Sequence, residues 1–158
     1  MKLVNDKVFL DTNIIIYLYS NDEPEKQQIA YDILEQYSNQ ILISNQVINE
    51  LSNILFRKFK LDENEVRNTV LELDDNFPIV NFNLQTQLQG ILIKGKYKLQ
   101  FYDSMILATA LDNGCNIVFS EDMQHNQVIE NSLTIINPFK KFKEEGIILQ
   151  KTLNSSKV

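Results

Sequence analysis

Short apolar runs alternate with longer amphipathic segments along most of the chain. Strand-like runs lie at 7–10, 41–43, within 77–82, at 116–120 and at 133–137. Helical periodicity, with apolar residues three and four positions apart, lies between them at 13–20, 24–37, 46–59, 62–75, 84–94 and 102–113. Strands that alternate with helices form parallel sheets covered on both faces. The pattern therefore predicts an α/β fold, a three-layer sandwich around a central, mostly parallel sheet of roughly five strands.

Capping residues mark several of the predicted helix boundaries. Ser44 or Asn45 is suited to cap the third helix. Asp62 opens the fourth helix with Glu65 three residues later, which is the pattern of a capping box. Gly95 follows the fifth helix, in the position where glycine commonly ends a helix.

Length and composition indicate one domain. The chain has 158 residues, of which 44% are hydrophobic, enough for a sizeable core. We place the domain at residues 1–139 and interpret the lysine-rich segment 140–158 as a C-terminal extension with a polar tail. No apolar run is long enough to span a membrane. The absence of a recognisable secretory signal and the single cysteine, Cys115, which we expect to be buried, predict a cytoplasmic protein.

The net charge of −6 argues against a nucleic-acid-binding protein, which usually carries a basic surface. That objection weakens if several of the carboxylates bind divalent cations. Basic residues form three short clusters, which we interpret as solvated surface: Arg57, Lys58 and Lys60; Lys94, Lys96 and Lys98; and Lys140, Lys141 and Lys143.

Two of the predicted parallel strands end in carboxylates. The first strand runs into Asp11, and the fourth runs into Ser120, Glu121 and Asp122. Because ligands bind at the carboxyl ends of parallel strands, Asp11 and Asp122 are expected at the same edge of the sheet. A carboxylate that ends an apolar strand has lost much of its hydration, so it stays charged only beside a cation or strong hydrogen-bond donors.

Two more carboxylates interrupt apolar helices. Glu50 lies at the border of an apolar stripe, and Asp103 opens a helix that is apolar nearly all round. Taken singly, each has a structural explanation, and Asp103 in particular suits a helix cap. Taken together, four carboxylates at one end of a sheet would repel one another unless a metal ion bound them. Oxygen ligands favour Mg²⁺ or Mn²⁺, and the chain has only one histidine and one cysteine to offer instead.

The ordered motifs around these four residues resemble a PIN domain. They are VFLDTN at the first strand, the helix carrying Asn49 and Glu50, the helix YDSMILATAL with Asp103, and IVFSED with Asp122. More narrowly, the set resembles the VapC-type toxin ribonucleases of toxin–antitoxin pairs, over residues 7 to about 139. The resemblance implies an Mg²⁺- or Mn²⁺-dependent endoribonuclease whose metal-binding and catalytic residues are Asp11, Glu50, Asp103 and Asp122.

The polar neighbours of these carboxylates are expected to orient the metal ligands. They are Thr12, Asn13, Ser120 and Glu121. The chain departs from the family here, because many relatives read T-N-D at the end of this strand and carry another acid just downstream, where Met123 and Gln124 stand. Alternation along an extended segment points Glu121 away from Asp122. Binding of one ion and binding of two both stay open.

A toxin of this type implies an RNA substrate, a protein antitoxin that blocks the site, and a homodimer. The first two predicted helices carry more apolar residues than one core face needs. These residues are Ile14, Ile15, Tyr17, Leu18, Tyr19, Ile29 and Ile33. Burial within the domain and a protein interface both account for them.

Two other functions fit part of the pattern. A haloacid-dehalogenase-like phosphatase also begins with an apolar strand ending in aspartate, but it needs a second aspartate two residues on, where Asn13 stands. A catalytically inactive PIN scaffold that binds RNA or a protein partner would keep the fold, but the intact set of four carboxylates argues against it. The only histidine, His125, is expected in an exposed loop, and a mechanism with a histidine pair is excluded.

Overall fold

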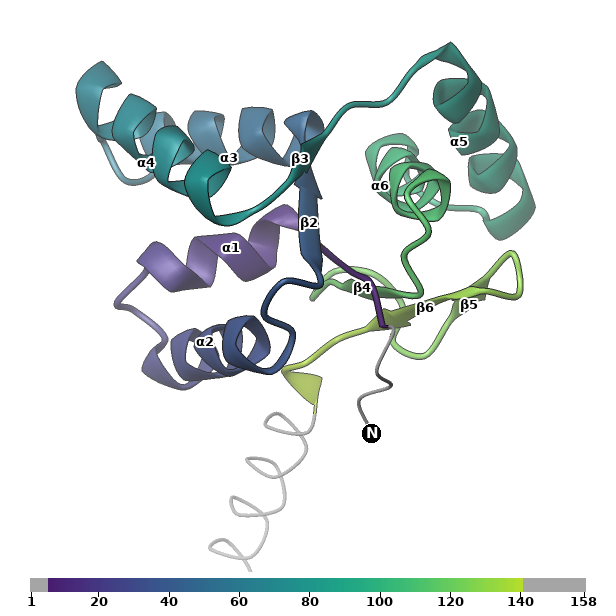
Figure 1. Cartoon of the computed structure of the whole chain (residues 1–158), viewed down its shortest axis with the longest axis horizontal. Coiled ribbons are helices and arrows are strands. Elements are labelled where there is room, and N and C mark those ends of the chain that lie inside the picture. The colour runs from purple at the N-terminus through teal and green to yellow at the C-terminus, as the bar shows by residue number, and fades with distance from the viewer. Residues whose placement is uncertain (1–5, 141–158) are drawn as a thin grey trace, which may run out of the picture.

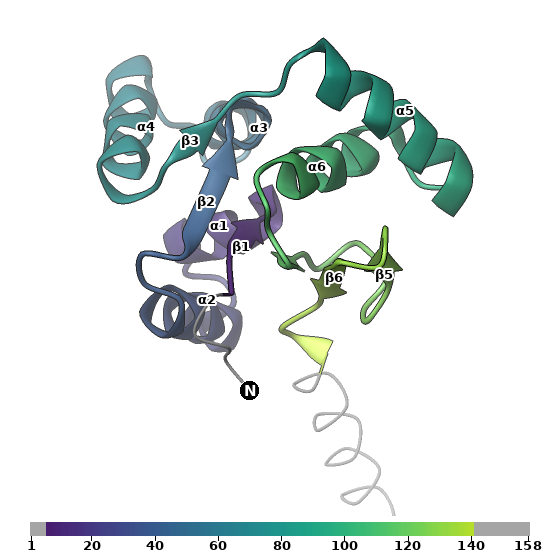
Figure 2. The same cartoon turned by 45° about the vertical axis from the view of Figure 1, so that its right-hand side comes forward.

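The computed structural model of the chain describes residues 6–140, and the predicted extension beyond Lys140 lies outside them. A six-stranded sheet carries helices on both faces (Figures 1 and 2). The strands are β1 (Val8–Leu10), β2 (Ile41–Ser44), β3 (Ile79–Val80), β4 (Ile117–Phe119), β5 (Val128–Ile129) and β6 (Leu133–Ile136). The helices are α1 (Thr12–Tyr19), α2 (Pro24–Gln36), α3 (Asn45–Arg57), α4 (Glu63–Asn76), α5 (Leu84–Tyr97) and α6 (Phe101–Asp112). The predicted α/β sandwich is confirmed.

The strand order places β1 near the centre of the sheet. The order is β3-β2-β1-β4-β6-β5, and neighbouring strands are parallel except β5 with β6. Connections from β1 lead first towards β2 and β3, and then across to β4. Right-handed crossovers in opposite directions put their helices on opposite faces, so α1 and α2 lie on one side and α5 and α6 on the other (Figures 1 and 2). The register sets Leu10 opposite Phe119, so Asp11 and Ser120 emerge next to each other.

The core lies on both faces of β1 and under α6. All residues from Ser104 to Ala110 are buried, which explains why this helix is apolar nearly all round. On the other face, Ile14 and Ile15 are fully buried. The other apolar residues of the first two helices, for which the sequence left burial and a protein interface open, are buried or pack against the core. Burial within the domain therefore accounts for these residues. No helix in the described part of the chain is long and apolar enough to cross a membrane.

The two predicted N-terminal caps are present. Ser44 accepts a hydrogen bond from the Val47 N–H at 3.4 Å, and Asp62 forms the expected capping box with Glu65. Cys115 is buried, as predicted.

The structure differs from the sequence pattern in two places. The strand β5 was missed, because two residues are too few for alternation to show. Its hairpin with β6 turns at Glu130 and Asn131, which both have positive φ angles, of 50° and 57°. The helix α5 also continues through Gly95 to Tyr97 and is capped by Lys98, whose φ is 55°. Tyr97 packs against the core, which keeps the last turn helical.

Candidate metal centre

Asp11 lies at the carboxyl end of β1 and caps α1. Its Oδ1 accepts a hydrogen bond from the Thr12 N–H at 2.8 Å, and its Oδ2 accepts one from the Ser120 hydroxyl at 2.7 Å. Burial raises the pKa of Asp11 from 3.8 to about 6; the charges of Glu50 and Asp103 add to the rise, and the two hydrogen bonds oppose it. A buried carboxylate whose pKa is raised by the charges of two others is a candidate to bind a cation.

Glu50 extends from α3 towards the start of α1. The Thr12 hydroxyl donates to its Oε2 at 2.6 Å, and the Gln46 side chain donates to its Oε1 at 2.9 Å. Both carboxylate oxygens are therefore held in place. Nothing in the sequence pointed to Gln46, because a glutamine one turn before a glutamate on a helix is common.

Asp103 lies in the first turn of α6 but is not its cap. The cap position belongs to Gln100, whose side chain makes no capping hydrogen bond, so the cap interpretation of Asp103 is wrong. Burial raises the pKa of Asp103, and the charges of Asp122 and Glu50 add to the rise. Among residues 6–140 no group donates a hydrogen bond to its carboxylate, which is therefore available to a ligand.

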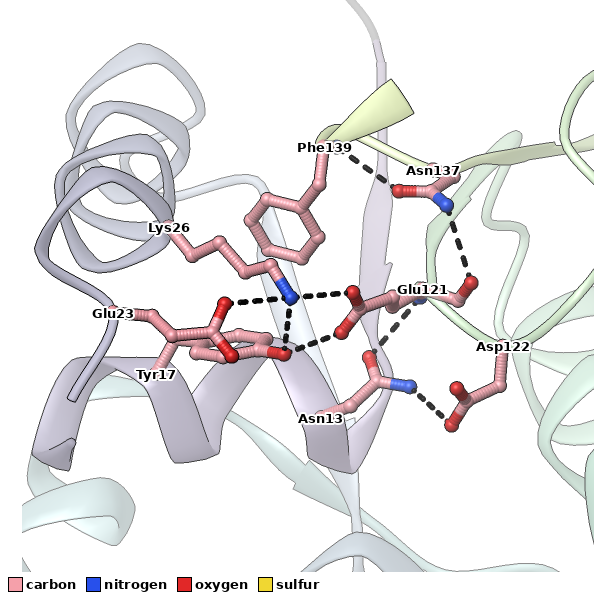
Figure 3. Close-up of polar contacts among 8 residues, drawn as sticks. All are labelled: Asn13, Tyr17, Glu23, Lys26, Glu121, Asp122, Asn137 and Phe139. Atoms are coloured by element: carbon pink, nitrogen blue, oxygen red, sulfur yellow. Dashed lines mark hydrogen bonds and ion pairs between the residues drawn. The ribbon is translucent and has the colours of Figure 1, made fainter. Parts of the chain in front are cut away.

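Glu121 and Asp122, neighbours in the loop after β4, have carboxylates with different partners (Figure 3). The Asn13 amide nitrogen donates to Asp122 Oδ2 at 3.0 Å, and the Asn13 amide oxygen accepts from the Glu121 N–H at 3.2 Å. The Glu121 carboxylate instead accepts a hydrogen bond from the Tyr17 hydroxyl at 2.5 Å and forms an ion pair with Lys26 at 2.7 Å. Asp122 lies close enough to Asp103 for their charges to repel, whereas the Glu121 carboxylate is held by Tyr17 and Lys26.

Lys26 was missed in the sequence. Its side chain is only 11% exposed, and its Nζ lies 2.7 Å from Glu121 and 2.8 Å from Glu23 (Figure 3). The spacing of Lys26, Ala30 and Ile33 places the lysine on the apolar face of α2, which the sequence already indicates. All three residues are buried. A lysine in an apolar stripe needs a buried anionic partner.

Asn137 holds the same loop from the other side. Its side chain donates to the Glu121 carbonyl at 3.2 Å and accepts from the Phe139 N–H at 2.9 Å (Figure 3). The Asn137 N–H in turn donates to His125 Nδ1 at 3.0 Å. His125 is therefore half-buried and bonded, not exposed as expected from the sequence. The backbone that carries Asp122 is fixed by contacts on both sides.

The charges of the four carboxylates act on one another, but their side chains are not arranged as a closed set of metal ligands. Among residues 6–140, no three side chains of Asp, Glu, His or Cys are grouped so that they could hold a metal ion. Asp11, Glu50 and Asp122 are held by hydroxyl or amide donors, and burial and mutual repulsion raise the pKa values of Asp11 and Asp103. A divalent cation would relieve that repulsion, and an all-oxygen donor set suits Mg²⁺ or Mn²⁺.

The sequence matches one family model, and the fold matches solved structures. Residues 8–130 match the model of the PIN domain. No curated protein matches the sequence. A toxin–antitoxin complex from Klebsiella pneumoniae is similar, with a TM-score of 0.65 and 23% identity, over 84% of this chain and 98% of that chain.

Two further solved structures share the fold. DNA-bound VapBC from Salmonella typhimurium has a TM-score of 0.64 and 18% identity, over 82% of this chain and 96% of that chain. A VapC toxin from Mycobacterium tuberculosis that cleaves the sarcin-ricin loop has a TM-score of 0.59 and 16% identity, over 73% of this chain and 92% of that chain. Sequence identities this low show a common fold rather than a common substrate or partner.

Proposed function

Because the chain belongs to the PIN-domain family, we propose that it is a metal-dependent endoribonuclease that hydrolyses phosphodiester bonds in RNA. One observation carries the proposal: the charges of Asp11, Glu50, Asp103 and Asp122 are coupled at the carboxyl end of the sheet. The net charge of −6 is no obstacle, because cations held there would attract the phosphate backbone.

The ion is Mg²⁺ or Mn²⁺, with Asp11, Asp103 and Asp122 as its ligands. Asp103 supports this assignment, since no donor from residues 6–140 occupies its carboxylate, and Asp122 is exposed at the edge of the group. When bound, the ion would lower the pKa of a water molecule and neutralise charge on the scissile phosphate. Thr12 and Gln46 hold Glu50, so that it either completes the ligand set or orients the attacking water.

One ion accounts for the site better than two. The Glu121 carboxylate is held by Tyr17 and Lys26. Met123 is buried, and Gln124 is uncharged, so neither of the two residues after Asp122 offers another anionic ligand. Thr12, Asn13 and Ser120 each donate a hydrogen bond to one carboxylate of the group and thereby orient it.

The protein is further proposed to be the toxin of a toxin–antitoxin pair. The similar structures named above, which are toxin–antitoxin complexes and a toxin, support an antitoxin as partner. A homodimer is part of the same proposal. The apolar residues Leu84 and Leu92 of α5 are 71% and 73% exposed, which suits a protein contact on that helix.

The alternative is an inactive PIN scaffold that binds RNA or a protein. It leaves unexplained why three separate carboxylates each keep a side-chain donor, from Thr12, Asn13 and Ser120. Orienting hydrogen bonds of this kind are typical of metal ligands and are not needed by a surface that only binds.

A cleavage assay tests the proposal. RNA is incubated with the wild type, with Asp11→Asn and with Asp75→Asn, which alters an exposed carboxylate of α4. The wild type and Asp75→Asn should cut RNA in Mn²⁺ and stop when the ion is chelated. Asp11→Asn should cut roughly 100-fold more slowly or not at all. Equal cleavage by all three proteins would rule out the proposed site.

A further inference from the structure

A cavity of about 400 Å³ opens beside Glu50, where the first turns of three helices meet. It is lined from α3 by Asn45, Gln46, Asn49 and Glu50, from α5 and the segment before it by Phe82 and Gln87, and from α6 by Phe101, Tyr102 and Met105. Because Glu50 belongs both to this cavity and to the carboxylate group, a ligand in the cavity would lie next to the proposed cleavage site.

The lining has the chemistry of a site for a flat, neutral, polar ligand. Among the described residues that line the cavity are three aromatic rings and four side-chain amides, and of these lining residues only Glu50 is charged. A phosphate would require cations, and none of the described lining residues is a lysine or an arginine. A nucleobase fits instead, because its ring stacks on aromatic side chains and its edge hydrogen-bonds with amides.

Tyr102 is the most accessible of the three aromatic residues that line the cavity. Its residue is 68% exposed, although residues 104–110 of the same helix are all buried. Its ring contacts Phe101 edge-on, with the centroids 5.4 Å apart. An exposed tyrosine beside a carboxylate group offers a stacking surface that the core does not need.

Hydrogen bonds couple this wall to the carboxylate group. The Gln46 side chain donates both to Glu50 Oε1, at 2.9 Å, and to the Tyr102 carbonyl, at 3.1 Å. Asn45 Oδ1 is buried without a hydrogen-bond partner among the described residues. A small rotation of Asn45 would present this acceptor to an amino group of a base, which would satisfy it.

We propose that this cavity binds one unpaired base of the RNA, next to the phosphodiester bond that is cut. The inference rests on the proposed ribonuclease function and adds the form of its substrate, which is single-stranded at this nucleotide. A base within a duplex would expose no face to Tyr102.

The test uses the Asp11→Asn variant, in which cleavage is expected to be too slow to interfere with a binding measurement, and a fluorescent single-stranded RNA of mixed sequence. In a series of copies, one base at a time is replaced by an abasic ribose. One abasic position should weaken binding roughly 10-fold, in line with the loss of one stacked base. Adding Tyr102→Ala should weaken binding of the intact RNA by a similar factor. In this double variant, the abasic substitution at that position should no longer weaken binding further.

Tyr31→Ala is the matched control, since Tyr31 is an exposed tyrosine, 48% accessible, on α2. It should leave both the affinity and the abasic pattern unchanged. Unchanged RNA binding by the Tyr102→Ala protein would overturn the base site. The same conclusion would follow if Tyr102→Ala reduced self-association of the protein and left its RNA binding unchanged. The wild type is assayed for Mn²⁺-dependent cleavage in parallel, so that failure of the base site and failure of the ribonuclease proposal are separate results.

Discussion

The ammonium nitrogen of Lys26 lies 2.7 Å from Oε1 of Glu121, and both side chains are nearly buried, at 11% and 12% exposed. The pair joins α2 to the loop after β4. The next residue in that loop is Asp122, whose carboxylate is held by Asn13. Asn13 also accepts a hydrogen bond from the Glu121 N–H, so the ion pair and the proposed metal ligand share one set of contacts.

Lys26→Met should therefore weaken both the fold and the metal site. It leaves Glu121 buried without its cation, which should lower the free energy of unfolding by about 3 kcal/mol. Because the loop then loosens, the Mn²⁺ concentration needed for half-maximal cleavage should rise. Urea unfolding and a Mn²⁺ titration of activity measure the two effects.

The exposed pair of Lys96 and Glu130 provides the control, because its lysine side chain is 61% exposed. Lys96→Met should change neither measurement, since an exposed pair is screened by water. If Lys26→Met lowers stability but leaves the Mn²⁺ requirement unchanged, the pair holds the fold together and does not position Asp122.

Asp11→Asn should stabilise the metal-free protein at neutral pH. The pKa of Asp11 is raised from 3.8 to about 6 in the fold, so the folded state binds this proton more tightly than the unfolded state does. The contribution of Asp11 to stability is then favourable below pH 4 and is lost as the pH rises to about 6. Removal of the charge should recover about 3 kcal/mol at pH 7.5.

Urea unfolding with chelator at pH 4 and pH 7.5 tests this expectation. The difference between Asp11→Asn and the wild type should be small at pH 4 and large at pH 7.5. Asparagine keeps the helix cap, so the comparison isolates the charge. A variant that is less stable than the wild type at pH 7.5 would show that the carboxylate is not strained by burial and by its neighbours.

Two glycines of α5 should respond differently to replacement by alanine. A Cβ at Gly95 would meet nothing within 4 Å, so Gly95→Ala should stabilise the helix by about 0.5–1 kcal/mol. A Cβ at Gly90 would lie 2.5 Å from the sulfur of Met105, which is buried under this helix. Gly90→Ala should therefore be less stable than Gly95→Ala by about 1 kcal/mol or more. Thermal unfolding of the two variants compares them, and equal melting temperatures would show that Met105 moves aside at no cost.

Much of the fold was predictable because its signals are local. Apolar runs such as Val8–Leu10 and the capping box at Asp62 depend on neighbours in the chain, and both appear as expected. The strand β5 and the end of α5 depend on tertiary packing, and both were missed. Gly95 was interpreted as a helix end because its sequence position fits one, but the packing of Tyr97 keeps the helix going.

For the site, the sequence indicated the four carboxylates and three of their hydrogen-bond donors, Thr12, Asn13 and Ser120, but neither Gln46 nor Lys26. Asp11 and Asp122 could be placed at one edge because they end strands, a relation that parallel topology guarantees. Glu121 looked like a further polar neighbour of the site, but its side chain turns to Lys26, which is 95 residues away in the chain. Contacts at that separation leave no periodic signal in a single sequence.

Direct Mn²⁺ binding tests the central claim, that the coupled carboxylates around Asp11 hold a divalent cation. Calorimetric titration at pH 7.5 should show one ion bound per chain by the wild type and by Asp75→Asn. Asp11→Asn should bind the ion at least roughly 10-fold more weakly, because it removes a charged ligand from the centre of the group. No binding by the wild type, or equal binding by Asp11→Asn, would contradict the account.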